Sequence, residues 1–275
     1  MTATAQTARS MWTLFEPIHA VTYFAPEARS AFEQAGLRGF WRGYFAGRTA
    51  PLAPAFVARA VPGIWELITP EEALRTRLAG ATEALRGLLA GLESETAEAA
   101  DLLWQATGEL DCSGRVLAAA NAALIEDGAA GLSGLARLWQ VATLLREHRG
   151  DGHFAALAAA GIDGCEAVVL RSRLDLRRED LQPVRGWTDE AWESALGRLA
   201  DRGWISADGA LTDAGRDAHA AVEDATDRAA ARPWARLGAG TTAEVVKVLT
   251  PVALACASVL PYPSPIGVPV PGTTG

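Results

Sequence analysis

Helical periodicity is the feature that most constrains how this chain can fold. Ala, Leu, Arg and Glu recur at three- and four-residue spacing along most of its length, whereas alternating runs of Val, Ile and Thr are nearly absent. Gly and Pro interrupt the pattern at intervals that suit helix ends. The sequence therefore predicts a mainly α fold.

Composition excludes several classes of protein. The 275 residues are 49% hydrophobic and 21% charged, which is typical of a globular chain of one large or two medium domains. A net charge of -8 argues against a protein that wraps nucleic acid electrostatically. The three cysteines form no CxxC pair, so neither a disulfide framework nor a cysteine-rich zinc module is expected. The N-terminus has no apolar signal region, and the longest apolar stretch, 248–260, is too short to span a bilayer. We expect a cytoplasmic protein without a membrane partner.

Capping signals divide the chain into segments. Thr69 suits the N-cap of a helix, because Pro70 can occupy its first position and Glu72 can close a capping box. Segment 51–62 is interrupted by prolines and should be irregular or a short helix. The Pro-rich tail, 261–275, should be extended, and mobile unless it docks. The expected helices cover residues 12–24, 26–35, 38–46, 69–92, 94–107, 113–126, 135–148, 151–160, 188–202 and 242–260.

Local patterns repeat between the two halves of the chain. Residues 35–39 and 160–164 both read Ala-Gly, an aliphatic residue, a charged residue and a second Gly, and Thr188 repeats the helix start at Thr69. Either the chain duplicates one helical unit, or helix caps simply resemble one another. The predicted organisation is a helical half over 1–133, a winged-helix-like half over 134–260, and a flexible tail over 261–275. If the chain is duplicated, the first half is related to the winged helix as well.

Residues 186–227 carry the most specific local signal. A capped helix ends at Gly203, residues 204–206 suit a short strand, and Asp208-Gly209 suits a hairpin turn. Leu211 would begin the second strand, and Thr212 would cap a long helix. Helix, β-hairpin wing and helix in this order predict a winged-helix arrangement.

These residues carry a family resemblance. The runs 199–205 and 211–216 resemble the C-terminal half of a MarR-type winged helix. Segments 16–24, 43–52 and 148–153 are similar to an actinobacterial, SalK-like family labelled helix-turn-helix. The resemblance spans most of the chain and implies a winged-helix fold of the DNA-binding type, but it brings no reaction with it.

The charges on the expected recognition helix disfavour DNA as a partner. Segment 189–202 carries four acidic residues against two basic ones, Arg198 and Arg202, and the wing tip around Asp208 has no cation. One basic cluster precedes this helix, and it either contacts DNA or is a solvated, partly paired helix end. It comprises Arg171, Arg173, Arg177, Arg178 and Arg185.

The first expected helix holds a candidate acid–base group. Glu16, His19 and Tyr23 share one helix face, so a carboxylate, an imidazole and a phenol would lie together. Such a set suits general acid–base catalysis, with His19 as the acid–base group. A buried structural histidine is the alternative.

Segment 148–153 is the second candidate site. Two glycines would loosen a turn between helices, gathering His148, Arg149, Asp151 and His153 in one loop. Arg149 would bind an anionic group of a ligand through its guanidinium fork, and His148 would join the catalytic groups. Alternatively, Asp151 is only an N-cap and Arg149 its surface partner.

Two further residues would belong to the predicted pocket. Tyr44 and Arg48 lie one helical turn apart and would extend the pocket. No HxxxH or HExxH spacing and no phosphate- or dinucleotide-binding fingerprint occurs, so no metal and no cofactor is expected.

Together these features predict a small-molecule-binding, winged-helix-derived protein with an acid–base pocket between its halves. Its partner would be a small organic ligand with an anionic group, and it would perform a biosynthetic step in natural-product metabolism. The main alternative is a ligand-responsive, MarR-like transcriptional regulator that binds DNA. A third possibility is a non-catalytic partner protein that docks, or forms a homodimer, through its last helix.

Overall fold

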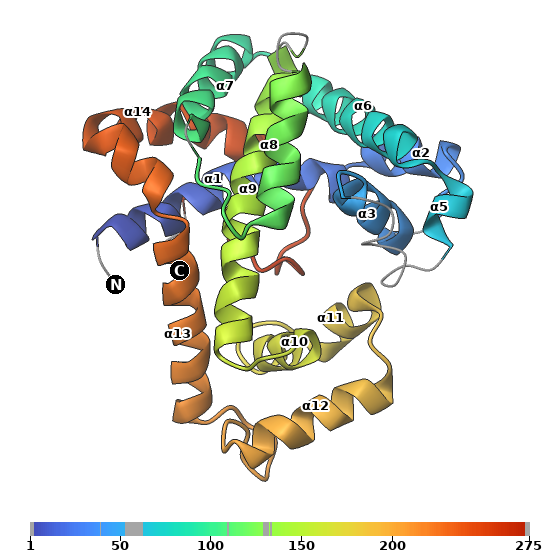
Figure 1. Cartoon of the computed structure of the whole chain (residues 1–275), viewed down its shortest axis with the longest axis vertical. Helices are drawn as coiled ribbons and strands as arrows, with labels where there is room; N and C mark the ends of the chain where they lie inside the picture. Colours follow the sequence, from blue (N-terminus) through green and yellow to red (C-terminus); the bar gives the residue numbers. More distant parts are fainter. Residues whose placement is uncertain are drawn as a thin grey trace.

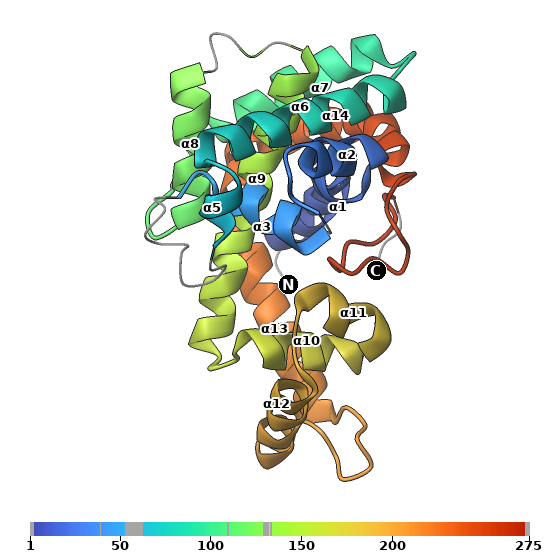
Figure 2. The same ribbon diagram turned by 90° about the vertical axis from the view of Figure 1, so that its right-hand side faces the viewer.

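The computed structural model describes residues 3–38, 40–52, 63–108, 110–128, 132 and 134–272. Two helical units are visible in it: a larger body and a smaller unit of α10, α11 and α12 (Figure 1). The long helices α9 and α13 pack side by side and connect the two units (Figures 1 and 2). The helices are α1 (Ala3–Phe24), α2 (Pro26–Gln34), α3 (Phe40–Thr49), α5 (Ile64–Leu67), α6 (Pro70–Leu88), α7 (Glu93–Thr107), α8 (Val116–Gly128), α9 (Gly134–Ala159), α10 (Gly164–Ser172), α11 (Arg178–Arg185), α12 (Asp189–Asp201), α13 (Asp213–Ala229) and α14 (Arg232–Ala257).

The body is organised around one hydrophobic core. This core includes four completely buried side chains: Met11 and Ile18 of α1, Trp139 of α9 and Leu249 of α14. Helices from both predicted halves of the chain therefore share this core. Burial of such side chains contributes roughly 1.5–3 kcal/mol each, which makes this core the main source of stability.

Helix α14 begins at Arg232 and is kinked at Gly238, whose φ of 76° and ψ of 165° are not helical, so its second part begins near the predicted start at 242. By length and composition it could cross a membrane, as could α9 and α10 taken together as one span bent by 95°. In this structure α14 packs against α1 and α7, and Val245, Leu249 and Val252 enter the body core. Its apolar residues are thus largely explained by packing within the chain.

The small unit has a hydrophobic cluster of its own. Leu170 of α10, Leu181 of α11, and Trp192 and Leu199 of α12 meet there. The predicted cap at Thr188 is confirmed, because its side chain accepts a hydrogen bond from the Ala191 N–H at 3.2 Å. A similar bond, from the Glu72 N–H, confirms the cap at Thr69.

The predicted β-hairpin wing is wrong. Among the described residues the segment between α12 and α13 forms a tight turn with one isolated antiparallel bridge, Ile205 to Leu211, and no β-strand. Left-handed Gly203 ends the preceding helix, and the Thr212 side chain caps the next one. Two backbone hydrogen bonds flank this bridge, from the Ser206 N–H to the Ala210 carbonyl and from the Thr212 N–H to the Trp204 carbonyl, so the pairing stops after one residue pair. The mainly α class is confirmed.

The predicted turn between two helices at 148–153 is also wrong. Helix α9 runs without a break through both glycines. A Cβ at Gly152 would lie 3.0 Å from the Ala229 Cβ, and one at Gly150 would lie 3.7 Å from an Arg48 nitrogen. Only the first distance is shorter than an ordinary contact, so close packing against α13 favours glycine at 152, and tertiary contacts offset its low helix propensity.

The Pro-rich tail docks onto the molecule. Val268 is buried beside Tyr23 and Tyr44, and the carbonyl of Pro265 accepts a hydrogen bond from Arg185. Figure 2 shows the tail between the body and α11. Most of the segment 51–62, predicted to be irregular or a short helix, lies outside the described residues.

The repeated Ala-Gly motifs adopt the same local structure. Gly36 and Gly161 are both left-handed, and the amides of Leu37 and Ile162 bond to the carbonyls of Phe32 and Leu157. This is the Schellman type of helix end, which many unrelated helices share. Duplication of the chain, and the domain boundaries drawn from it, stay predictions.

Candidate functional site

A cavity of about 560 Å³ lies between the body and the small unit. This volume falls within the range of ligand-binding pockets, roughly 300–1,000 Å³. Its apolar wall comes mainly from α10, α11 and the segments beside them, and its charged wall comes from α1, α3, α9 and α13. The tail residues Pro265, Ile266 and Gly267 form part of the lining.

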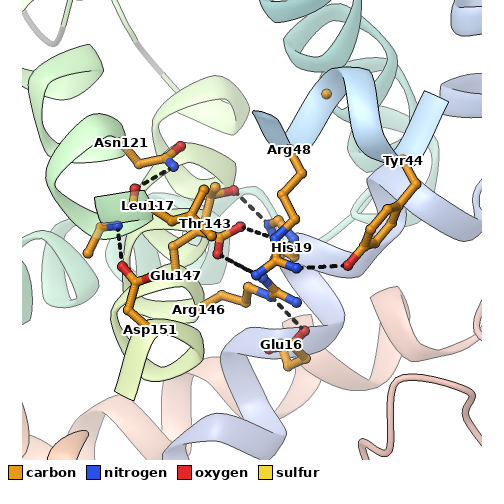
Figure 3. Close-up of polar contacts among 12 residues, drawn as sticks. Glu16, His19, Tyr44, Arg48, Leu117, Asn121, Thr143, Arg146, Glu147 and Asp151 are labelled. Atoms are coloured by element: carbon orange, nitrogen blue, oxygen red, sulfur yellow. Dashed lines mark hydrogen bonds and ion pairs between the residues drawn. The ribbon is translucent and has the colours of Figure 1, made fainter. Parts of the chain in front are cut away.

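Glu147 organises the charged wall. Its carboxylate accepts two hydrogen bonds from Arg48, at 3.2 and 3.1 Å, and one from Arg146 at 2.8 Å (Figure 3). Burial alone would raise the pKa of Glu147, but the charges of Arg146 and Arg48 outweigh it and lower the pKa to about 2. The carboxylate therefore stays ionised and holds both guanidinium groups in place.

Glu16 completes this wall. It accepts a hydrogen bond from the Trp12 indole at 2.9 Å and pairs with Arg146 at 3.4 Å. Glu16, Arg146 and Arg48 all line the cavity. The wall is thus a chain of paired charges, preorganised by bonds between helices.

His19 lies behind this wall and does not line the large cavity. The Thr143 hydroxyl donates to the Trp139 carbonyl at 2.8 Å, so it accepts from the Nδ1–H of His19 at 2.9 Å. Nε2 is then the acceptor for the Tyr23 hydroxyl, at 2.7 Å. Burial, followed by the charge of Arg146, lowers the pKa of His19 well below its usual value. The imidazole is neutral with both nitrogens bonded.

Tyr44 is the phenol that lines the cavity. Its hydroxyl accepts a hydrogen bond from Arg48 at 3.0 Å, and its ring centre lies 4.8 Å from that of Tyr23. Burial would raise the pKa of Tyr44, but nearby Arg48, Arg146 and Arg185 outweigh it and lower the pKa. Burial raises the pKa of Tyr23 instead. Of these two phenols, Tyr44 is the stronger acid.

Arg149 belongs to a second charged cluster at the edge of the cavity. It pairs with Asp227 at 3.0 Å and Glu223 at 3.6 Å, and its guanidinium lies 4.6 Å from the centre of the Trp12 ring. Arg9 pairs with the same two carboxylates. The charge predicted to bind an anion is therefore already balanced.

The remaining predicted residues are dispersed. His153 lines the cavity and bonds Thr226 at 3.0 Å. Asp151 lies inside α9 and accepts from the Ala118 N–H at 2.9 Å near the start of α8, whereas Arg149 pairs with Asp227 and not with Asp151. His148 is buried next to Arg115 and does not line the cavity. Glu16, Tyr44, Arg48, Arg149 and His153 are brought to one cavity, and catalytic roles for Glu16, His19, Tyr23 and His148 stay predictions.

Sequence reasoning missed Arg146, Glu147, Phe154 and the small-unit residues Arg185 and Trp187. All except Glu147 line the large cavity, and Glu147 lines the adjoining small one. The sequence carries a signal for some of these missed residues. On one unbroken helix Thr143, Arg146, Glu147, Gly150, His153, Phe154 and Leu157 follow a three- and four-residue spacing. The predicted turn at 148–153 concealed this face.

Comparison with known protein families identifies the family of this chain. The sequence model of a helix-turn-helix family matches residues 8–262. The chain belongs to this helix-turn-helix family. The comparisons found no similar protein among curated proteins or among solved structures. Membership of this family indicates a fold of the DNA-binding type.

The two basic side chains of α12 are engaged within the small unit. Arg198 pairs with Asp163 at 2.6 Å and Glu166 at 2.8 Å. Arg202 donates to the carbonyl of Gly161 at 2.6 Å and stacks on Trp204. Arg198 would have to leave two carboxylates before it could bind a phosphate, and Arg202 would have to share its guanidinium with the Gly161 carbonyl.

Buried His148 should make stability depend on pH. Burial, followed by the charge of Arg115, lowers its pKa from 6.5 to about 4. The native state then binds this proton less readily than the unfolded state, so the stability is fully present above pH 6.5 and is lost as the pH falls towards 4. The shift corresponds to roughly 3 kcal/mol over this window.

Urea unfolding of the wild type and His148→Gln at several pH values checks this prediction. Other groups titrate equally in both proteins, so the variant should lose less stability on acidification. Parallel pH profiles would show that His148 does not contribute.

Proposed function

We propose that the protein binds a small, largely apolar organic ligand in the cavity between the body and the small unit. The observation that supports this proposal best is the cavity itself, about 560 Å³ in volume, with one apolar wall and one charged wall. A space of this size with a few oriented polar groups is the usual form of a small-molecule site.

The two walls would contact different parts of a ligand. Leu157, Leu176, Leu181 and Trp187 offer an apolar surface on which a ring or chain can bury its area. On the charged wall, Arg48 is held by Glu147 and donates to the Tyr44 hydroxyl, so these two groups can orient the polar groups of a ligand. Their mutual hydrogen bonds reduce the entropy lost when a ligand binds.

We further propose that the cavity serves a biosynthetic step in natural-product metabolism. Tyr44 is the acid–base candidate, because it lines the cavity beside Arg48 and its pKa is lowered by the surrounding guanidinium groups, against the effect of burial. His19 and Tyr23 lie behind it and support its position. This assignment moves the acid–base role from His19, which the sequence favoured, to the phenol within reach of a ligand.

Filling the cavity should abolish ligand binding. Leu157→Trp places a large ring in the space, while Leu174→Trp, at a half-exposed position that does not line the cavity, is the matched control. With the neutral fluorescent probe phenylnaphthylamine, we expect saturable binding to the wild type and the control. The Leu157→Trp protein should bind at least about tenfold more weakly, a loss of roughly 1.4 kcal/mol. Equal binding by all three proteins would exclude this cavity as the binding site.

Removing the Tyr44 hydroxyl should abolish turnover. Incubation with a panel of small aromatic acids, followed by mass spectrometry, would reveal a converted compound. We expect Tyr44→Phe to lower its rate by about 10²-fold or more. Tyr262→Phe, at an exposed phenol outside the cavity lining, is the control. A converted compound whose turnover survives in Tyr44→Phe would remove Tyr44 from the mechanism.

A ligand-responsive, MarR-like or SalK-like regulator is the second candidate. Family membership and the exposed position of α12 at one end of the molecule favour it (Figure 1). The acidic surface of α12 and the engagement of Arg198 and Arg202 oppose it. We therefore rank DNA binding below ligand binding.

Fluorescence anisotropy with a random duplex and with the promoter of its own gene separates the two candidates. We expect binding weaker than the roughly 10⁻⁴–10⁻⁶ M that is typical of non-specific DNA binding at physiological salt. Specific binding in the nanomolar range, released by a small molecule, would establish the regulator instead.

A further inference from the structure

Arg185 differs from every other arginine that lines the cavity. It belongs to the last turn of α11, and its Nη2 donates to the Pro265 carbonyl at 2.9 Å. No carboxylate among the described residues lies within ion-pair distance of its guanidinium. Its positive charge therefore enters the cavity region without a counter-charge.

The other cavity arginines are neutralised in pairs. Arg48 and Arg146 lie with the two carboxylates of Glu147 and Glu16. Arg171 pairs with Asp175 at 2.7 Å.

Arg149 is balanced in the same way. Together with Arg9, it pairs with the two carboxylates of Glu223 and Asp227. His153 is neutral near pH 7, because burial lowers its pKa below 6.5 despite the opposing charge of Glu223. One excess positive charge, that of Arg185, remains at the cavity.

The surroundings of Arg185 suit an anion with an apolar body. Leu181 lies one helical turn before it on α11, and Trp187 lies two residues after it; both line the cavity. The Tyr44 hydroxyl, on the opposite wall, is close enough for the charge of Arg185 to lower its pKa, after the larger effects of burial, Arg48 and Arg146.

We propose that the ligand is an amphiphilic organic anion, whose acidic group bonds to Arg185 and whose apolar body lies on the wall formed by Leu176, Leu181 and Trp187. The proposal rests on the function proposed above and names the class of its ligand. The guanidinium keeps further N–H groups for a carboxylate or sulfonate, because the Pro265 carbonyl accepts only one of its bonds. That same bond, from the tail, holds the fork in position.

Two probes with one skeleton test the proposal. Anilinonaphthalene sulfonate and phenylnaphthylamine share their aromatic rings, and only the first carries an anionic group. We expect the wild type to bind the sulfonate at least about tenfold more tightly than the neutral amine. Arg185→Gln should remove this preference by weakening the sulfonate about tenfold while changing the amine less than about twofold.

Three further variants test whether the preference for the sulfonate depends on Arg185. Arg171→Gln also removes a cavity arginine, but one whose charge Asp175 already balances, so the preference for the sulfonate should persist. Arg185→Lys keeps the charge and loses the fork, and it should restore part of the preference. Leu157→Trp should block both probes and so locate them in the cavity.

The outcomes separate the two proposals. If both probes bind in the cavity with equal affinity, or if Arg185→Gln weakens both equally, the ligand class is wrong and the cavity still binds small molecules. If the Arg171→Gln protein loses the preference as fully as the Arg185→Gln protein, Arg185 is not the anion-binding group. If neither probe binds, or Leu157→Trp affects neither, the proposed function itself fails.

Discussion

The buried carboxylate of Glu147 is the constraint on which the charged wall of the cavity depends. An ionised group with a side chain only 1% exposed is unfavourable unless it is fully paired. Here it receives hydrogen bonds from Arg48 of α3 and from its neighbour Arg146. The pairing fastens α3 to α9 and thereby places Tyr44 at the cavity. Loss of the carboxylate would leave two guanidinium groups without their counter-charge and release that wall.

The cavity exists because two units are held together without complete contact. Helices α9 and α13 connect them, and the ion pairs of Arg9 and Arg149 with α13 stiffen this connection. The tail adds a third link, through Pro265 and Arg185. Trp187, which lines the cavity, lies two residues before α12. This residue therefore joins the cavity lining to the start of α12, a helix whose Arg198 is paired within the small unit.

Prediction from the sequence succeeded where structure is set by neighbouring residues. The caps at Thr69 and Thr188 and the Gly36 and Gly161 helix ends depend on a few adjacent dihedrals and hydrogen bonds. It failed at the wing, where pairing stops after the single bridge between Ile205 and Leu211, and at 148–153, where packing of Gly152 against α13 offsets the low helix propensity of glycine. Five predicted site residues, Glu16, Tyr44, Arg48, Arg149 and His153, line the cavity. Arg146 and Glu147 were missed because the predicted turn broke the helix face that they share with His153.

By itself, the sequence determined a mainly α chain, most helix positions, the acidic character of α12 and membership of a helix-turn-helix family. These properties follow from local periodicity, capping and composition. Only the tertiary structure decided which charges are paired and which one remains. Arg149 and Arg185 are equivalent cations in the sequence, yet one meets Asp227 and Glu223 from a distant helix and the other meets only a carbonyl of the tail. Charge balance in a partly buried site is set by contacts between residues far apart in the chain, and local sequence does not specify those contacts.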